Sequence, residues 1–330
     1  MNRTTNAGKI TEHFSKAFAI LAVLVAASAF NAFAETHALL VGVGRYPTLP
    51  THRQLSGPPN DVQELRAALT ARGLKRITTL SDSEPKQPTR ANILAGLDGL
   101  IAQSAPGDWL FAFFAGHGGQ QPVPVRTPTE PDDLDELFLP ADVGRWNAAR
   151  KTVDNAITDN EFGAWIARAR ASGRHVWVVF DTCHAGDMSK AFRPSVGADV
   201  RMREVSPAEL GIPAVPDTPG RRTVKSKFIS SSQSKAFIST QFVAMYAAQE
   251  NEPTPEERRS FNGRSQSMGL FTASLLDSLR DRPTASARDL IVEVKRRYQV
   301  EKRVFPTPWA EGNVDAVLPL TSGKGATPTR

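Results

Sequence analysis

Three continuous apolar runs set the strongest constraint on how this chain can fold. The runs cover residues 38–44, 108–114 and 175–180. Short apolar runs of this kind are typical of strands that are buried on both faces of a parallel sheet. Amphipathic patterns of helical period lie between them, at residues 60–69, 89–101 and 158–169. Strands that alternate with helices predict an α/β fold with a mostly parallel central sheet and helices on both faces.

Reactive side chains follow two of these runs directly. The second run leads into Ala115-Gly-His-Gly-Gly119, and the third leads into Asp181-Thr-Cys-His-Ala-Gly186. In folds of this type, ligands bind beyond the carboxyl ends of the strands. The topology therefore predicts a site at His117 and Cys183 before any family is considered.

Cys183 and His117 have the chemistry of a nucleophile and its general base. A thiol attacks a carbonyl only as thiolate, and a neighbouring imidazole promotes its ionisation and later protonates the leaving amine. The backbone N–H groups of Gly118 and Cys183 are in a position to stabilise a tetrahedral oxyanion. Cys183 is the only cysteine of the chain, so no disulfide within the chain can form.

Other interpretations of these residues stay open at this point. A cysteine at the end of an apolar strand is often an inert buried residue, and His117 could equally be structural. His184 is a rival base, although neighbours along an extended segment point to opposite faces. A zinc site formed by His117, His184, Asp181 and Cys183 is conceivable, but the ligand spacing matches no common zinc pattern.

The first 34 residues have the pattern of a secretory leader. Arg3, Lys9 and Lys16 precede an apolar run at 17–30, and Ala32-Phe-Ala34 follows the run. This predicts a signal peptide of residues 1–34 and a periplasmic or secreted protein. The alternative is a membrane anchor, but the run is shorter than the ~20 residues that a spanning helix needs. Contact with a membrane is expected only through an uncleaved leader.

The remaining residues predict one domain, at 35–320, followed by a tail at 321–330. Two stretches without a regular apolar pattern, 193–225 and 247–267, are predicted as flexible insertions. The formal net charge is +6, and the basic residues are scattered rather than interleaved with aromatic ones. A nucleic-acid partner is therefore not expected.

Five segments, in order along the chain, resemble motifs of one family. Phe113-Phe-Ala-Gly-His-Gly118 resembles the catalytic histidine motif of caspase-like peptidases, and 181–186 resembles the cysteine motif of metacaspases and paracaspases. Residues 55–61, 135–142 and 269–272 are similar to three further segments of that family. The resemblance implies a caspase-like fold and a cysteine endopeptidase that acts on proteins or peptides through a thioester acyl-enzyme.

The resemblance also implies a specificity. Caspases cut after aspartate and have glutamine two places before the nucleophile, where this chain has Asp181. In metacaspases and paracaspases the matching aspartate, with one at the position of Asp61, lines a pocket for arginine or lysine. A carboxylate binds a guanidinium through two charge-assisted bonds and repels an acidic side chain. Simpler roles remain for both residues, as a helix-start residue for Asp61 and a turn residue for Asp181.

Some features of the family are missing or uncertain here. Many metacaspases have serine where Ala115 stands, and a cysteine common in the first segment is Pro58 in this chain. No cofactor is required by the sequence. Calcium dependence is common in the family, and the acidic loop offers oxygen ligands at Glu130, Asp132, Asp133, Asp135 and Glu136. The loop follows no EF-hand pattern, and most acidic loops are simply solvated.

The leading hypothesis is thus an endopeptidase directed to arginine or lysine. The insertion at 193–225 is also expected to be cut by the enzyme itself, because it combines predicted flexibility with basic residues. These are Arg201, Arg203, Arg221 and Arg222. Two rival hypotheses are a catalytically silent caspase-like binding module and a hydrolase or transferase that acts on a non-peptide acyl group.

Overall fold

A six-stranded sheet forms the centre of the computed structural model. The structure describes residues 34–123, 134–183, 200–214, 240–249, 252–282 and 284–317. The central strands are β1 (Thr36–Gly42), β2 (Arg76–Ser81), β3 (Trp109–Ala115), β9 (His175–Asp181), β11 (Phe242–Tyr246) and β14 (Trp309–Gly312). Their order is β14-β11-β9-β3-β1-β2. Five of them run parallel, and β14 pairs with β11 in the antiparallel sense at one edge.

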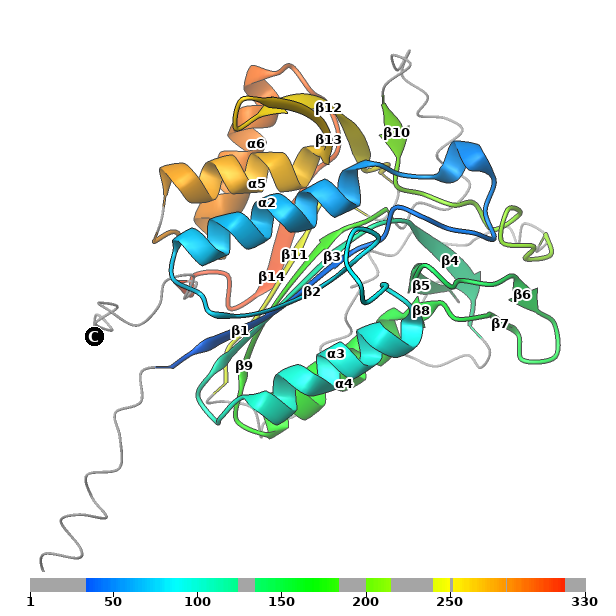
Figure 1. Cartoon of the computed structure of the whole chain (residues 1–330), viewed down its shortest axis with the longest axis horizontal. Coiled ribbons are helices and arrows are strands. Elements are labelled where there is room, and N and C mark those ends of the chain that lie inside the picture. The colour runs from blue at the N-terminus through cyan, green and yellow to red at the C-terminus, as the bar shows by residue number, and fades with distance from the viewer. Residues whose placement is uncertain are drawn as a thin grey trace, which may run out of the picture. The chain divides into compact units, whose positions relative to one another are not determined.

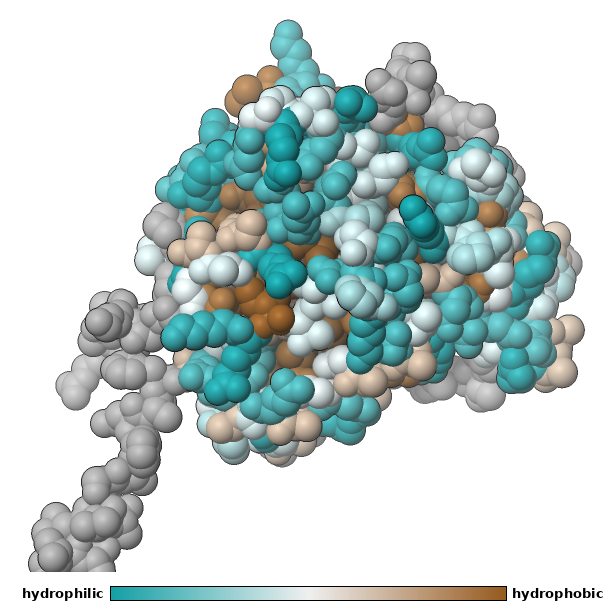
Figure 2. Space-filling view, in the orientation of Figure 1, coloured by the Kyte–Doolittle hydropathy of each residue, from teal (hydrophilic) through white to brown (hydrophobic). Residues whose placement is uncertain are grey.

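Helices cover both faces of this sheet (Figure 1). One face carries α2 (Gly57–Ala71), α5 (Leu270–Asp281) and α6 (Ala287–Val300), and the other carries α3 (Arg90–Gln103) and α4 (Asp159–Ala171). Each layer has its own cluster of buried apolar side chains. In Figure 2 the outward surfaces of α2 and α3 are mostly hydrophilic, and hydrophobic residues show in the gap between these helices. The prediction of an α/β fold with a mostly parallel sheet is confirmed.

Short strands form three smaller sheets outside the central one. One small sheet contains β4 (Gly118–Pro122), β5 (Leu134–Phe138) and β8 (Ile157–Thr158), and a second contains β10 (Arg201–Met202), β12 (Pro255–Phe261) and β13 (Arg264–Gly269). A further pair is formed by β6 (Trp146–Asn147) and β7 (Thr152–Val153), and Thr51–Arg53 forms a 3-10 turn.

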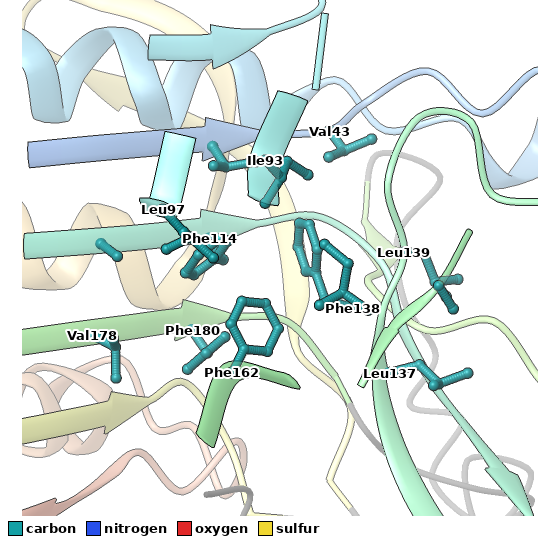
Figure 3. Close-up of a cluster of buried hydrophobic side chains, with 14 of the residues drawn as sticks. Val43, Ile93, Leu97, Phe114, Leu137, Phe138, Leu139, Phe162, Val178 and Phe180 are labelled. Atoms are coloured by element: carbon teal, nitrogen blue, oxygen red, sulfur yellow. The ribbon is translucent and has the colours of Figure 1, made fainter. Parts of the chain in front are cut away.

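An aromatic cluster lies directly beneath the ends of β3 and β9. Phe114 and Phe180 stack with their ring centroids 5.2 Å apart, and Phe162 of α4 contacts both rings edge-on. Phe138 packs against the same ring of Phe114 (Figure 3). Because buried rings in contact resist displacement, this cluster fixes the two strand ends that carry the predicted site.

The stretch 247–267 is not a flexible insertion, and this prediction was wrong. It contains β12 and most of β13, which pair as an antiparallel hairpin. The strand β12 contains many charged residues, so the sequence did not predict a strand there. Two of these residues form ion pairs just after α6, Arg259 with Glu301 and Glu257 with Arg303. Asn262 and Gly263 at the turn both have positive φ angles, and Asn-Gly is a strong hairpin signal.

The stretch 193–225 also differs from its prediction where it is described. Residues 200–214 include β10, and Arg203, Val205 and Leu210 are fully buried. The segment was predicted to be flexible because it lacks a regular apolar pattern, but the side chain of Arg203 is buried against carboxylates. Among the described residues, no helix is long and apolar enough to cross a membrane.

Candidate active site

The register of two neighbouring strands brings the predicted dyad to one edge of the sheet. β3 and β9 are adjacent and parallel, and Ala115 pairs with Asp181 at their carboxyl ends. His117 and Cys183 each follow these paired residues by two positions. Since neighbouring strands lie about 5 Å apart, both residues leave the sheet at the same place.

His117 is held by its backbone and by one of its ring nitrogens. Its N–H donates to the hydroxyl of Tyr46 at 2.7 Å, and that hydroxyl donates to the carbonyl of Val43 at 3.1 Å. The Nε2 atom lies 2.6 Å from the carbonyl oxygen of Arg53. A carbonyl accepts only, so Nε2 carries the proton and Nδ1 is left as an acceptor. Within the described residues, the buried Nδ1 has no hydrogen-bond partner.

Burial lowers the pKa of His117 to about 4. The carbonyls of Arg53 and Arg203 act in the opposite direction, because they favour the charged ring, but burial outweighs them. The ring is therefore neutral at neutral pH, with a nitrogen ready to accept a proton. This is the protonation state that a general base requires.

Cys183 is fully buried, but it does not belong to the apolar core clusters. Its thiol donates to the carbonyl oxygen of Glu252 at 3.1 Å. Its backbone N–H donates to the carbonyl oxygen of Arg203 at 3.3 Å. The residue is thus bonded to two segments that are distant in the sequence, near residues 203 and 252.

The two predicted oxyanion donors point at a single atom. The N–H groups of Gly118 and Cys183 both donate to the carbonyl oxygen of Arg203, at 3.1 and 3.3 Å. Two N–H groups converging on one carbonyl oxygen is the arrangement that stabilises a tetrahedral oxyanion in acyl transfer.

The side chain of the same arginine lies in a buried acidic pocket. The Nη2 atom of Arg203 is 2.5 Å from Oδ2 of Asp61 and 3.5 Å from Oε2 of Glu256, and Nη1 is 3.1 Å from Oδ2 of Asp181. All four side chains are at most 2 % exposed. The structure therefore brings the two predicted pocket residues together and adds Glu256, which lies in the stretch predicted to be flexible.

The start of α5 holds the two aspartates in place. The N–H of Gly269 donates to Oδ1 of Asp61 at 3.0 Å. The N–H and hydroxyl of Thr272 donate to Oδ2 of Asp181 at 3.1 and 2.5 Å. Free N–H groups at a helix start favour negative charge. They orient both carboxylates toward the guanidinium of Arg203.

Two glycines make room for the guanidinium. A Cβ atom on Gly57 would lie 2.7 Å from Nη2 of Arg203, and one on Gly269 would lie 2.7 Å from Nη1 and 2.2 Å from Oδ2 of Asp181. Any larger residue at either position would fill the space that the guanidinium occupies. These glycines come from two of the segments that carry the family resemblance.

The charges of the pocket do not balance, because three carboxylates face one guanidinium. Burial raises the pKa of Asp61 to about 7; the charge of Arg203 lowers it and the charge of Asp181 raises it. The three carboxylates in turn raise the pKa of Arg203 although burial opposes them. The guanidinium of Arg203 is therefore surrounded by more carboxylates than it can neutralise.

Part of the chain matches a known protein family. Residues 36–191 match the family model described as Metacaspase, peptidase C14 domain. Over this range, which is just under half of its length, the chain is similar to the peptidase domain of metacaspases. The matched range contains both strand ends, His117 and Cys183.

Curated metacaspases are similar over the same part of the chain. Metacaspase-1 of Candida albicans is 31% identical over 166 residues, which are 48% of this chain and 35% of that protein. Metacaspase-8 of Arabidopsis thaliana is 30% identical over 48% of this chain and 39% of that protein. Metacaspase-1B of Aspergillus fumigatus is 34% identical over 45% of this chain and 35% of that protein. The chain thus spans well under half the length of these relatives.

A solved structure is similar over most of the fold. The crystal structure of a Geobacter sulfurreducens protein superposes with a TM-score of 0.59 and covers 88% of this chain and 100% of its own. The sequence identity is 19%. At that identity the likeness concerns the fold alone, and it agrees with the sheet and helix layers of this chain.

Several residues of the candidate site were not found from the sequence. Tyr46, Arg53 and Glu256 lie outside the five motif segments, and no local pattern marks them. Gly57 and Thr272 lie within motif segments, so a search for glycines and hydroxyls beside the two aspartates would have found them.

Other predicted residues lie outside the described ranges. This applies to His184, to Glu130, Asp132 and Asp133 of the acidic loop, and to Arg221 and Arg222. Asp135 is described, and it accepts hydrogen bonds from Gln121 and Asn160. Within the described part of the chain, no group of three or more His, Cys, Asp or Glu side chains is placed to hold a metal ion.

Proposed function

We propose that the chain is a cysteine endopeptidase that cleaves peptide bonds after arginine or lysine, with Cys183 as nucleophile and His117 as general base. One observation carries the proposal. A single residue, Arg203, has its carbonyl oxygen at the two predicted oxyanion donors and its guanidinium among three carboxylates. The donors and the pocket are therefore spaced for an arginine residue whose carbonyl is to be attacked.

The reaction follows from the groups present. Nδ1 of His117 takes the thiol proton, and the thiolate of Cys183 attacks the substrate carbonyl carbon. The oxyanion is stabilised by the N–H groups of Gly118 and Cys183, each worth about 3–4 kcal/mol of barrier in related cases. His117 returns the proton to the leaving amine, and a thioester remains. Water, deprotonated by His117, then releases the acid product and the free thiol.

The pocket sets the preference of the enzyme. Arginine matches it best because its planar fork of donors reaches two carboxylates at once, whereas lysine offers one compact charge. An aspartate substrate would bring a fourth carboxylate into a buried cluster that already has an excess of negative charge. The substrates are therefore proteins or peptides with basic residues at the cleavage point.

Peptides with one fluorogenic leaving group after Arg, Lys or Asp test this proposal. We expect hydrolysis after Arg, slower hydrolysis after Lys and none after Asp, with all activity lost in Cys183→Ala. Cleavage of the Asp peptide alone would refute the acidic pocket as the substrate site. Activity that survives in Cys183→Ala would refute the nucleophile.

The full burial of Cys183 favours a second candidate, a catalytically silent module that uses the pocket to bind basic segments. A thiol-directed covalent probe that carries arginine distinguishes the two. Labelling of the folded protein supports the peptidase, and absence of labelling with retained binding of Arg peptides supports the module. Hydrolysis of a small ester without hydrolysis of any peptide would favour the non-peptide acyl substrate instead.

We further propose that residues 1–34 direct export to the periplasm or beyond. The support is the basic, apolar and small-residue pattern described above, and an exported protein with one cysteine keeps that thiol unpaired within the chain. Fractionation of expressing cells, with sequencing of the mature N-terminus, is the test. Calcium dependence stays a prediction from the family, and titration with calcium and a chelator during peptide hydrolysis decides it.

A further inference from the structure

A carboxylate meets the first residues of the fold at the amino ends of the central strands. The backbone N–H of Glu35 donates to Oδ1 of Asp108 at 2.9 Å, and the N–H of Ala105 donates to Oδ2 at 2.8 Å. Nε2 of His37 lies 3.3 Å from the same Oδ2, and the side chain of Asp108 is only 13% exposed. Asp108 directly precedes β3, so this carboxylate lies at the end of the strand opposite to the candidate active site.

Strand pairing fixes the backbone of Glu35 beside this carboxylate. The N–H of Trp109 donates to the carbonyl oxygen of Glu35 at 2.8 Å, and Thr36, the first residue of β1, pairs with Trp109. The side chain of Glu35 accepts from Nε of Arg76 at 2.6 Å. The position of the Glu35 nitrogen is therefore set by contacts with β2 and with the start of β3.

The predicted cleavage point of the leader falls on this nitrogen. The sequence Ala32-Phe-Ala34 predicts a cut after Ala34, and the compact unit of the fold begins at Glu35. In the cut, water adds to the carbonyl carbon of Ala34 and the bond to the nitrogen of Glu35 breaks. Ala34 leaves with a carboxylate, and the nitrogen takes up the proton as an α-ammonium group. Every residue of β1 stays in the mature chain.

We propose that Asp108 is the binding site for the amino terminus that leader removal creates, and that their ion pair stabilises the mature fold relative to the precursor. The proposal rests on the cut after Ala34 proposed above and is independent of peptidase activity. In the precursor this nitrogen is a neutral amide, whereas in the mature chain the same atom carries a positive charge. A hydrogen bond between charged groups is roughly twice as strong as one between neutral groups. The gain in stability therefore arises only once the leader is gone.

The charged groups around the ammonium set the pH range of this gain. His37 faces Oδ2 of Asp108, and Arg76 faces the side chain of Glu35. The N–H of His175 donates to the backbone carbonyl of Asp108, and burial lowers the pKa of the His175 ring, so that ring is neutral at neutral pH. A free α-amino group has a pKa of about 7.7–8.0, and a neighbouring carboxylate raises it. The stabilisation is thus complete at pH 7 and is lost as the pH rises through the raised pKa.

Thermal unfolding of two chains in the Cys183→Ala background tests the ion pair. One chain begins at Glu35, and the other keeps Ala32-Phe-Ala34, which moves the ammonium away and leaves an amide at Glu35. At pH 7 the first should unfold about 2–3 °C higher, and Asp108→Asn should remove the difference. Arg76→Gln is the matched control, because it removes a contact of the Glu35 side chain and leaves the nitrogen in place. It should lower both unfolding temperatures equally.

A pH series gives a second readout that needs no variant of Asp108. The difference between the two chains should close between pH 7 and pH 10 as the ammonium loses its proton, and a difference that stays constant over this range would refute the ion pair. Equal unfolding temperatures at pH 7, or a difference that survives Asp108→Asn, would refute it as well.

Sequencing of the amino terminus of the exported protein separates this proposal from the one on which it rests. If the exported chain begins at Glu35 and the two chains unfold alike, the leader assignment stands and the role of Asp108 is refuted. If the exported chain begins at another residue, the cut after Ala34 is wrong, and the proposed terminus at Asp108 fails with it.

Discussion

Replacing Asp61 by asparagine tests the charge of the acidic pocket, because the change removes one negative charge and keeps the shape. The pKa of Asp61 is about 7 in the folded protein against an ordinary value of 3.8. Between these values the folded state binds a proton that the unfolded state has released. Stability therefore falls as the pH rises from about 4 to about 7 and is constant above that. At about 1.4 kcal/mol per pH unit the loss is ~4 kcal/mol. Coupling to Arg203 makes roughly 2–4 kcal/mol the expected range.

The assay is urea unfolding at pH 4.5 and pH 8 in the Cys183→Ala background, which prevents self-cleavage. Asp61→Asn lacks the titrating group, so its stability relative to the parent should rise by about 2–4 kcal/mol between these pH values. Asp98→Asn, at an exposed position, should give no such difference. In active protein at pH 8, kcat/KM for an Arg peptide should fall roughly 10- to 100-fold with Asp61→Asn. Parallel stability profiles for parent and Asp61→Asn would refute the reasoning.

Three further predictions concern the base and the pocket. The pKa of His117 is lowered to about 4 from 6.5, so between these pH values the unfolded state binds more protons and the folded state loses stability as the pH drops. His117→Asn should lack that loss when unfolding by urea is measured from pH 6.5 to pH 4. The same dependence of stability on pH in wild type and His117→Asn would contradict this prediction. Tyr46→Phe removes the hydroxyl that accepts the N–H of His117. It should lower the free energy of unfolding by about 1–3 kcal/mol and reduce the rate of peptide hydrolysis. Full activity would show that this hydrogen bond does not position the imidazole ring of His117. Gly269→Ala places a methyl group against Asp181 and Arg203. It should lower the free energy of unfolding by about 1–3 kcal/mol, measured by thermal unfolding, and raise the KM for Arg peptides. An unchanged KM would show that the pocket adjusts to the methyl group.

The sequence was sufficient to predict the strand ends and the residues that follow them. A strand that is buried on both faces needs a continuous run of apolar residues, so β3 and β9 can be recognised in the sequence without knowledge of the tertiary structure. His117 and Cys183 follow these two runs closely. That these strands are neighbours, and that Ala115 pairs with Asp181, depends on packing between distant segments. No local pattern contains that register, which is why the convergence of the two donors on Arg203 could not be predicted.

The missed part of the site has a common cause. Glu256 and residues 201–205 belong to short, charged segments whose order comes from ion pairs and from pairing with distant strands. A charged stretch ordinarily predicts a solvated loop, because isolated charges avoid burial. Here Arg203 is buried only because Asp61, Asp181 and Glu256 surround it. The Asn262-Gly263 turn was the one local signal for the hairpin, and it was visible in the sequence.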